Sequence, residues 1–117
     1  MKTITMQTRR TTYQMGIMEH GFLLHLYYGP RTEGSAENLL SYNDRGFSGN
    51  PYEVKEKREI SMDYLPQEYS CYGNGDFRSP AFRMKDENGV FAADLRYLSS
   101  KRYEGKYMIP GHVSYTH

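Results

Sequence analysis

Carboxylate and histidine side chains are the residues of this chain that could carry out acid–base or metal chemistry. Two carboxyl groups held close together can serve as a nucleophile and a general acid–base, but nothing in the sequence marks such a pair. Glu53, Glu56 and Glu59 stand among lysines and arginines and are predicted to be solvated. His20 and His25 would lie on opposite faces of a strand, which disfavours a shared metal ion. We therefore nominate no catalytic residue and no metal ligand.

The G-N-G-D turn at residues 73–76 is a candidate anion-binding site. Consecutive amides in such a turn can point at one anion, but the lysine and hydroxyl residues that complete a phosphate-binding loop are missing. We prefer a structural interpretation, in which the turn holds Asp76 against Arg78 or a backbone amide. Asp94-Leu95-Arg96 is interpreted as an ion pair in a buried sheet and not as a functional site.

Composition indicates one domain at most, which we assign to residues 1–117. The formal net charge of +1 gives no electrostatic footprint for nucleic acid. No apolar run reaches the roughly eighteen residues of a membrane-spanning helix, and the first residues lack the apolar core of a secretory signal. Cys71 is the only cysteine, so an internal disulfide is excluded and a small buried side chain is predicted. We expect a cytoplasmic protein without nucleic-acid or membrane partners.

Alternating apolar residues predict strands in the first part of the chain. Residues 3–8 alternate, and residues 11–18 place one apolar set on a single face: Tyr13, Met15 and Ile17. Residues 22–28 are apolar on both faces, with one face formed by Phe22, Leu24, Leu26 and Tyr28 and the other by Leu23, His25 and Tyr27. This pattern predicts a strand that is covered on both sides or lies centrally in a sheet.

Turn and breaker residues organise the rest of the chain. Residues 31–53 are rich in Gly, Pro, Ser and Asn and are predicted to form a long loop. Short strands are predicted at 58–63, at 77–84, where Pro80 indicates an edge or a bulge, and on the return from an Asn-Gly turn at 86–89. No helix of useful length is expected. Short strands with regular turn signals predict an all-β fold, specifically an antiparallel β-sandwich.

The segment LPQEYSCYGNGDFR at residues 65–78 combines a proline turn, a Gln-Glu pair, three aromatic residues and a glycine-rich turn. It resembles the amino-terminal domain of the bacterial and fungal α-galactosidases of glycoside hydrolase family 36, in which QEY, YG and DFR follow at the same spacing. The resemblance extends, in family order, through TTYQM (11–15), GFLLHLYYGPR (21–31), FSGNPYE (47–53), ISMDYLPQEY (60–69) and AADLRYLSSKRYEGKY (92–107).

The resemblance implies that the chain is the opening part of a larger, supersandwich-like β-domain that precedes a catalytic (β/α)₈ barrel. In the family, the catalytic aspartates lie in the barrel, in a motif that contains Lys-Trp-Asp. A barrel alone usually needs about 250 residues, and this chain has no tryptophan. We therefore expect a fragment without catalytic residues. The implied parent reaction is the cofactor-free, retaining hydrolysis of terminal α-1,6-linked galactose from melibiose- or raffinose-like sugars.

The resemblance also implies a substrate-contacting residue, Asp44, within SYNDRGFSGNP at residues 41–51. In the tetrameric bacterial branch of the family, this loop carries an Asp-Arg or similar pair, thought to reach an active-site mouth, including that of a neighbouring subunit. A carboxylate suits this role because it accepts two hydroxyl hydrogen bonds at once. Arg45 and Tyr42 are secondary candidates. Asn43-Asp44 is also common turn chemistry, so a purely structural turn stays open.

Three functions remain open. The chain could support the barrel, build oligomer contacts and trim the substrate pocket of an α-galactosidase. It could instead be a stand-alone galactoside-binding module, since aromatic faces stack on sugar rings and the chain has twelve tyrosines. The third possibility is a structural domain without sugar contact. Unpaired strand edges invite association, so we expect a homo-oligomer with Leu23, His25 or Tyr27 near a contact.

Overall fold

A computed structural model describes residues 1–40, 50–51, 60–73 and 75–106. The elements within these residues are the strands β1 (Lys2–Gln7), β2 (Thr11–Ile17) and β3 (Leu23–Pro30) and the short 3₁₀ helices η1 (Glu19–Gly21) and η2 (Glu37–Leu39). No helix in this part of the chain is long and apolar enough to cross a membrane. The predicted all-β class is confirmed.

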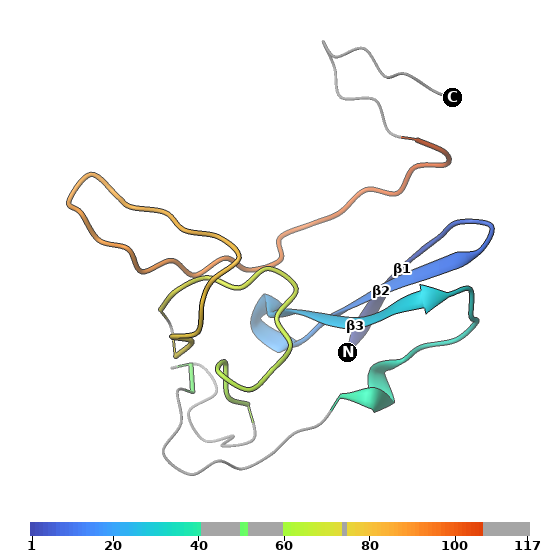
Figure 1. Ribbon diagram of the computed structural model, residues 1–117, viewed down its shortest axis with the longest axis horizontal. Helices are drawn as coiled ribbons and strands as arrows, with labels where there is room; N and C mark the ends of the chain where they lie inside the picture. The colour runs from blue at the N-terminus through green and yellow to red at the C-terminus, as the bar shows by residue number, and fades with distance from the viewer. Residues whose placement is uncertain (41–49, 52–59, 74, 107–117) are drawn as a thin grey trace.

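The strands form one antiparallel sheet in the order β1-β2-β3, with β2 in the centre (Figure 1). β3 therefore lies at an edge of this sheet in the described residues, so the central position, one of the two alternatives predicted for it, is wrong. Part of that edge is covered by a loop: the His25 amide donates to the Pro66 carbonyl (2.7 Å), and the Glu68 amide donates to the Leu23 carbonyl (3.0 Å). These bonds attach residues 66–68 to the outer side of β3.

A β-bulge in β3 changes which side chains share a face. Met15 pairs with His25 and Gln14 pairs with Tyr27, so Leu26 is the extra residue. Beyond the bulge, Tyr28 pairs with Tyr13 and points to the same face. The strict alternation predicted for residues 22–28, which grouped Tyr28 with Leu24, is therefore wrong, because an inserted residue reverses the side-chain direction.

The face of β2 that is buried is its polar face, not the apolar face that the sequence pattern suggests. Its polar and small residues are buried, namely Thr12, Gln14 and Gly16, whereas its apolar residues are half-buried, namely Tyr13, Met15 and Ile17. Residues 32–36 fold back over the polar face and satisfy it: the Thr32 amide donates to the Thr12 hydroxyl (3.0 Å), and the Ala36 amide donates to Gln14 Oε1 (3.0 Å). Buried polar groups are tolerated here because they are hydrogen-bonded.

The hydrophobic core lies where the start of β3 meets residues 60–65. Its buried members are Met18, Phe22, Leu24, Ile60, Met62 and Leu65, and Leu40 packs against them. Residues 62–64 form a turn in which the Leu65 amide donates to the Ser61 carbonyl (3.1 Å), so the strand predicted at 58–63 is wrong for its described part. The backbone is satisfied locally at this turn, while the side chains of Ile60 and Met62 are buried in the core.

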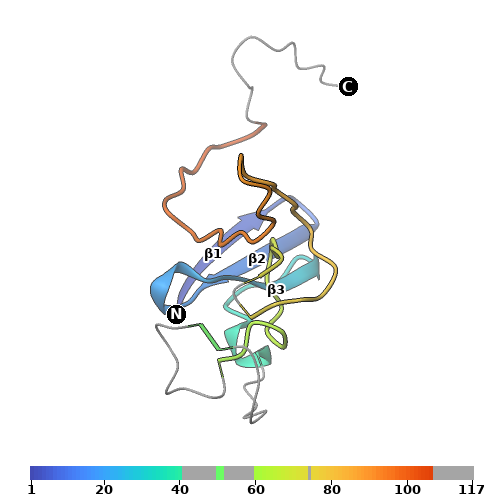
Figure 2. The same ribbon diagram turned by 90° about the vertical axis from the view of Figure 1, so that its left-hand side faces the viewer.

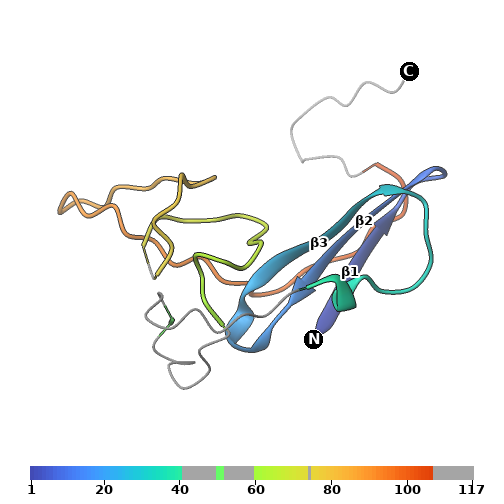
Figure 3. The ribbon, with the colours of Figure 1, turned by 60° about the horizontal axis from the view of Figure 1, so that its bottom comes forward.

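The strands predicted at 77–84 and after residue 89 are also absent from the described residues. The turn between them is confirmed, since the Gly89 amide donates to the Asp86 carbonyl (3.0 Å) and Asp86 Oδ1 accepts from the Asn88 amide (2.8 Å). Its two legs project away from the sheet (Figures 1 and 3) and leave Met84 and Phe91 exposed. The two segments that flank the turn are not packed on the sheet, and an isolated two-stranded hairpin is only marginally stable in water.

Residues 93–102, which we call the strap, run back along the sheet toward β1 (Figures 2 and 3). The Tyr97 amide donates to the Gly21 carbonyl (2.7 Å), and Arg102 Nη2 donates to the Thr5 carbonyl (3.1 Å). Within the strap, Arg96 lies 4.6 Å from the centre of the Phe22 ring and pairs with Asp94 at 2.8 Å. The predicted Asp94–Arg96 pair exists, but it is partly exposed and lies on the strap, not in a sheet.

The crossing of the strap over Gly21 leads to a stability prediction. Gly21 and Gly34 both have positive φ angles (+81° and +87°), so alanine at either position is strained by about 1 kcal/mol. At Gly21 a Cβ would also lie 3.0 Å from the Tyr97 carbonyl oxygen, whereas at Gly34 nothing lies within 4 Å. We expect urea denaturation to show a larger loss for Gly21→Ala than for Gly34→Ala. Equal losses would contradict the strap contact.

Candidate functional site

The loop from Leu65 to Arg78 is organised around one fully buried carboxylate, that of Asp76. The Arg78 side chain donates two parallel hydrogen bonds to this carboxylate, from Nε to Oδ1 (2.9 Å) and from Nη2 to Oδ2 (2.9 Å). The Arg78 amide donates a third hydrogen bond to Oδ1 (3.1 Å). Bidentate pairs of this kind are strong and directional. The predicted Asp76–Arg78 contact is confirmed.

The same ion pair ties other parts of the loop together. Arg78 Nη2 also donates to the carbonyls of Met62 (2.9 Å) and Leu65 (3.1 Å), and Gln67 Nε2 donates to Asp76 Oδ2 (2.6 Å). The Gly73 and Asp76 amides bond to each other's carbonyls inside the turn (2.9 and 3.0 Å). Because these amides are already used, they are not available for the anion site considered from the sequence.

The protonation of the pair follows from these contacts. Burial alone would raise the pKa of Asp76, but the hydrogen bonds and charge of Arg78, with help from Gln67, outweigh it and lower the pKa below its usual value. The hydrogen bond to Asp76 correspondingly raises the pKa of Arg78. A carboxylate held ionised in this way stabilises structure and is unsuited to donating a proton.

Glu68 fastens the loop to the sheet from the opposite side. While Gln67 turns toward Asp76, the neighbouring Glu68 accepts a hydrogen bond from the Tyr13 hydroxyl at Oε1 and contacts His25 Nδ1 at Oε2 (3.1 Å). The Tyr13 ring lies 5.3 Å from the His25 ring and 5.6 Å from the Tyr28 ring. We call these four side chains, Tyr13, His25, Tyr28 and Glu68, the Glu68 cluster.

Tyr13 is the titratable group most affected by this arrangement. The hydrogen bond to Glu68, burial and the Glu68 charge together raise the pKa of Tyr13 to about 12. The Tyr13 hydroxyl therefore stays a hydrogen-bond donor at neutral pH. The cluster was not predicted, because its members lie far apart in the sequence and meet only once the strand register and the loop position are known.

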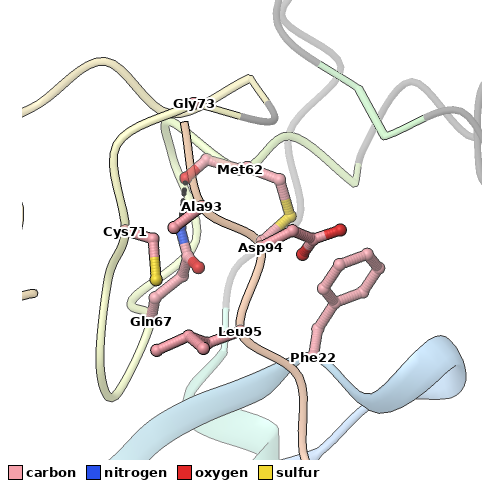
Figure 4. A pocket seen from close by; sticks show the side chains of 8 residues that line it. All are labelled: Phe22, Met62, Gln67, Cys71, Gly73, Ala93, Asp94 and Leu95. Carbon is pink, nitrogen blue, oxygen red and sulfur yellow. Dashed lines mark hydrogen bonds between the residues drawn. The ribbon is translucent and has the colours of Figure 1, made fainter. Parts of the chain in front are cut away.

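A small hollow lies between the loop and the strap (Figure 4). Its lining comes from Phe22, Met62, Gln67, Cys71, Gly73, Ala93, Asp94 and Leu95. The space open to the centre of a water molecule is about 10 Å³, enough for roughly one water. A sugar ring does not fit. Cys71 is buried beside the hollow, which confirms the prediction of a small buried side chain.

The predicted substrate-binding residues, Tyr42, Asp44 and Arg45, lie outside the described residues, as do Glu53, Glu56 and Glu59. Their roles stay predictions. Of the histidines, His20 falls in η1 with φ of +64°, and His25 lies in β3 within the Glu68 cluster. In the part of the chain that the structure describes, no group of three or more His, Cys, Asp or Glu side chains is placed to hold a metal ion.

Comparison with known proteins places this β-domain among the carbohydrate hydrolases. The model of the glycosyl hydrolase family 36 N-terminal domain matches residues 21–115. The chain therefore belongs to glycoside hydrolase family 36, as its N-terminal domain.

Characterised relatives agree with this assignment. The bifunctional α-galactosidase/sucrose kinase AgaSK of Mediterraneibacter gnavus is 49% identical over 94% of this chain, and α-galactosidase AgaA of Geobacillus stearothermophilus is 36% identical over 94%. These matches span only 12% and 15% of the two relatives. The solved galactosidase domain of AgaSK superposes with a TM-score of 0.85 over 94% of this chain and 15% of that structure. A doubly substituted variant of AgaA in complex with stachyose gives a TM-score of 0.82 with the same coverage.

Two Asp-x-Arg pairs allow a matched test of the buried ion pair. Asp76→Asn keeps the shape but removes the buried charge that faces Arg78, so we expect a loss of about 2–3 kcal/mol in the free energy of unfolding. Asp94→Asn makes the same change at the partly exposed pair and should cost less than about 1 kcal/mol. Urea denaturation of both variants measures the difference, and equal losses would contradict the assigned role of Asp76.

The raised pKa of Tyr13 predicts a stability change in alkali. The folded protein holds the phenol proton to a pKa of about 12, whereas the ordinary value is 10.0. The stability that the protonated Tyr13 hydroxyl contributes to the folded state is therefore complete below pH 10 and is lost as the pH rises toward 12. Tyr13→Phe should show a flatter loss of stability across this window. Identical profiles for wild type and Tyr13→Phe would show that Glu68 does not hold the proton.

Proposed function

We propose that this chain is the N-terminal β-domain portion of an α-galactosidase that removes terminal α-galactosyl groups from melibiose- or raffinose-type sugars. The observation that carries the proposal is the similarity to AgaSK, 49% identity over 94% of the chain with a TM-score of 0.85. Substituted variants of AgaA, a second relative, have been solved in complex with raffinose and with stachyose. The chemistry of such an enzyme needs two carboxyl groups about 5 Å apart, which we assign to the barrel of the parent protein.

Two of the described acidic residues support a non-catalytic role for this domain. Asp76 is buried against Arg78, and Glu68 is engaged by Tyr13 and His25. Both carboxylates are thus committed to holding the loop and the sheet in place. The domain would support the barrel and present the loop of residues 41–49 at the rim of the substrate pocket.

Both ends of that loop have anchors that suit such a presentation. Leu40 packs against the hydrophobic core on one side. On the other side Pro51 is buried, and the Asn50 side chain donates to the Ile60 carbonyl. A loop whose ends are fixed this closely to the core can offer Tyr42, Asp44 and Arg45 to a sugar or to a neighbouring subunit in an oligomer.

A chimera tests this proposal. The 110 aligned residues of AgaSK are replaced by this chain, and turnover of a nitrophenyl α-galactoside and of melibiose is measured. We expect the chimera to retain activity within about tenfold, a barrier change near 1.4 kcal/mol, whereas the isolated chain should hydrolyse neither substrate. Turnover by the isolated chain, or a folded chimera without activity, would contradict the proposal.

The same chimera tests the loop residues. Asp44→Ala should raise KM by about tenfold with a smaller effect on kcat, because it removes a charged hydrogen bond to the substrate. Glu87→Ala, in the exposed Asp86–Gly89 turn, is the matched control and should change neither constant. If Asp44→Ala behaves like Glu87→Ala, then Asp44 belongs to a structural turn.

A further inference from the structure

The Glu68 cluster forms a partly exposed surface that the proposed function does not use. It lies on the half-buried face of β2 and β3, and Tyr28 is the most open member, with 67% of its surface exposed. The bulge at Leu26 is what brings Tyr28 to this face beside Tyr13. Bulges commonly re-aim one side chain near a functional site, and here the re-aimed residue is the aromatic ring.

The polar side chains of the cluster, Glu68 and His25, are held in one orientation before any ligand binds. Glu68 is held by Tyr13 and His25, yet each carboxylate oxygen keeps lone pairs that can accept another hydrogen bond. A carboxylate that is ionised only accepts, so Nδ1 of His25 is the donor in this contact, and in the neutral tautomer Nε2 is an acceptor. The His25 side chain is 39% exposed and that of Glu68 is 19% exposed. A ligand would meet acceptors that need little reorganisation.

This combination suits one class of ligand. A pyranose ring has a face of C–H groups, which packs on an aromatic face, and hydroxyl groups around its edge, which donate to carboxylate and imidazole acceptors. The negative charge of Glu68 opposes phosphates and other anions, and a wholly apolar ligand would leave the carboxylate without a donor. We propose that the Glu68 cluster is a saccharide-binding site, in which Tyr28 stacks on the ring and Glu68 and His25 accept its hydroxyls.

Titration of the 117-residue chain with melibiose tests this site, with chemical shifts of the tyrosine rings and His25 as the readout. We expect saturable shifts of Tyr13, Tyr28 and His25 with a dissociation constant on the order of 1 mM. Tyr28→Ala removes the exposed stacking ring and should weaken binding by about tenfold or more. Because Tyr28 is mostly exposed, the variant should fold, which the spectrum itself verifies.

Tyr69→Ala is the matched control. Tyr69 is also exposed (53%) and also loses a single ring contact, with Phe82 at 5.8 Å, but it lies outside the cluster. Its affinity for melibiose should equal that of the wild type. Absence of saturable shifts in the wild type, or equal affinities of Tyr28→Ala and the wild type, would overturn the proposal and leave the cluster as a fastener of the loop. Neither result depends on α-galactosidase activity, so the proposed function is judged separately by the chimera.

Discussion

The ion pair between Asp76 and Arg78 is the interaction on which the rest of the described structure depends. The described residues contain only one small sheet, so the described residues beyond residue 60 lie outside any strand ladder. Arg78 replaces such a ladder by binding a buried carboxylate and two backbone carbonyls, those of Met62 and Leu65. Because a buried charge is costly unless it is paired, the loop has one strongly preferred conformation.

The adjacent side chains of Gln67 and Glu68 connect the ion pair to the sheet. Gln67 bonds to Asp76, and Glu68 turns the other way to reach Tyr13 and His25 on the sheet. Between them, the backbone of residues 66–68 bonds to the edge of β3. The loop, the sheet and the core around Leu24 and Leu65 are therefore one connected unit, and the strap closes over it at Gly21 and Phe22. The adjacent Gln67 and Glu68 thus link the buried ion pair to the sheet.

Sequence patterns correctly predicted the features that depend on interactions between residues close together in the chain. Alternation predicted β1 and β2, and the Asn-Gly dipeptide predicted the turn at 86–89. The glycine-rich turn at 73–76 predicted that Asp76 is held against Arg78 or a backbone amide. Failures occurred where distant residues decide the outcome. Gln14 is buried because residues 34–36 cover it, and Tyr28 changes face because of a bulge that periodicity does not reveal. The legs around 86–89 have strand-like sequences but no layer to pack on. The predicted substrate contact of Asp44 lies outside the described residues and stays a prediction that rests on the family resemblance.

Native-state hydrogen exchange on Arg78→Met tests the central role of the ion pair most directly. The substitution keeps side-chain volume but leaves the Asp76 carboxylate and two carbonyls without their donor. We expect the amides of His25, Glu68, Asp76 and Ala93, which bond within the loop or between the loop and its neighbours, to exchange much faster than in the wild type, while the β1–β2 amides keep their protection. Unchanged exchange at these four amides, or equal losses in β1 and β2, would contradict the account.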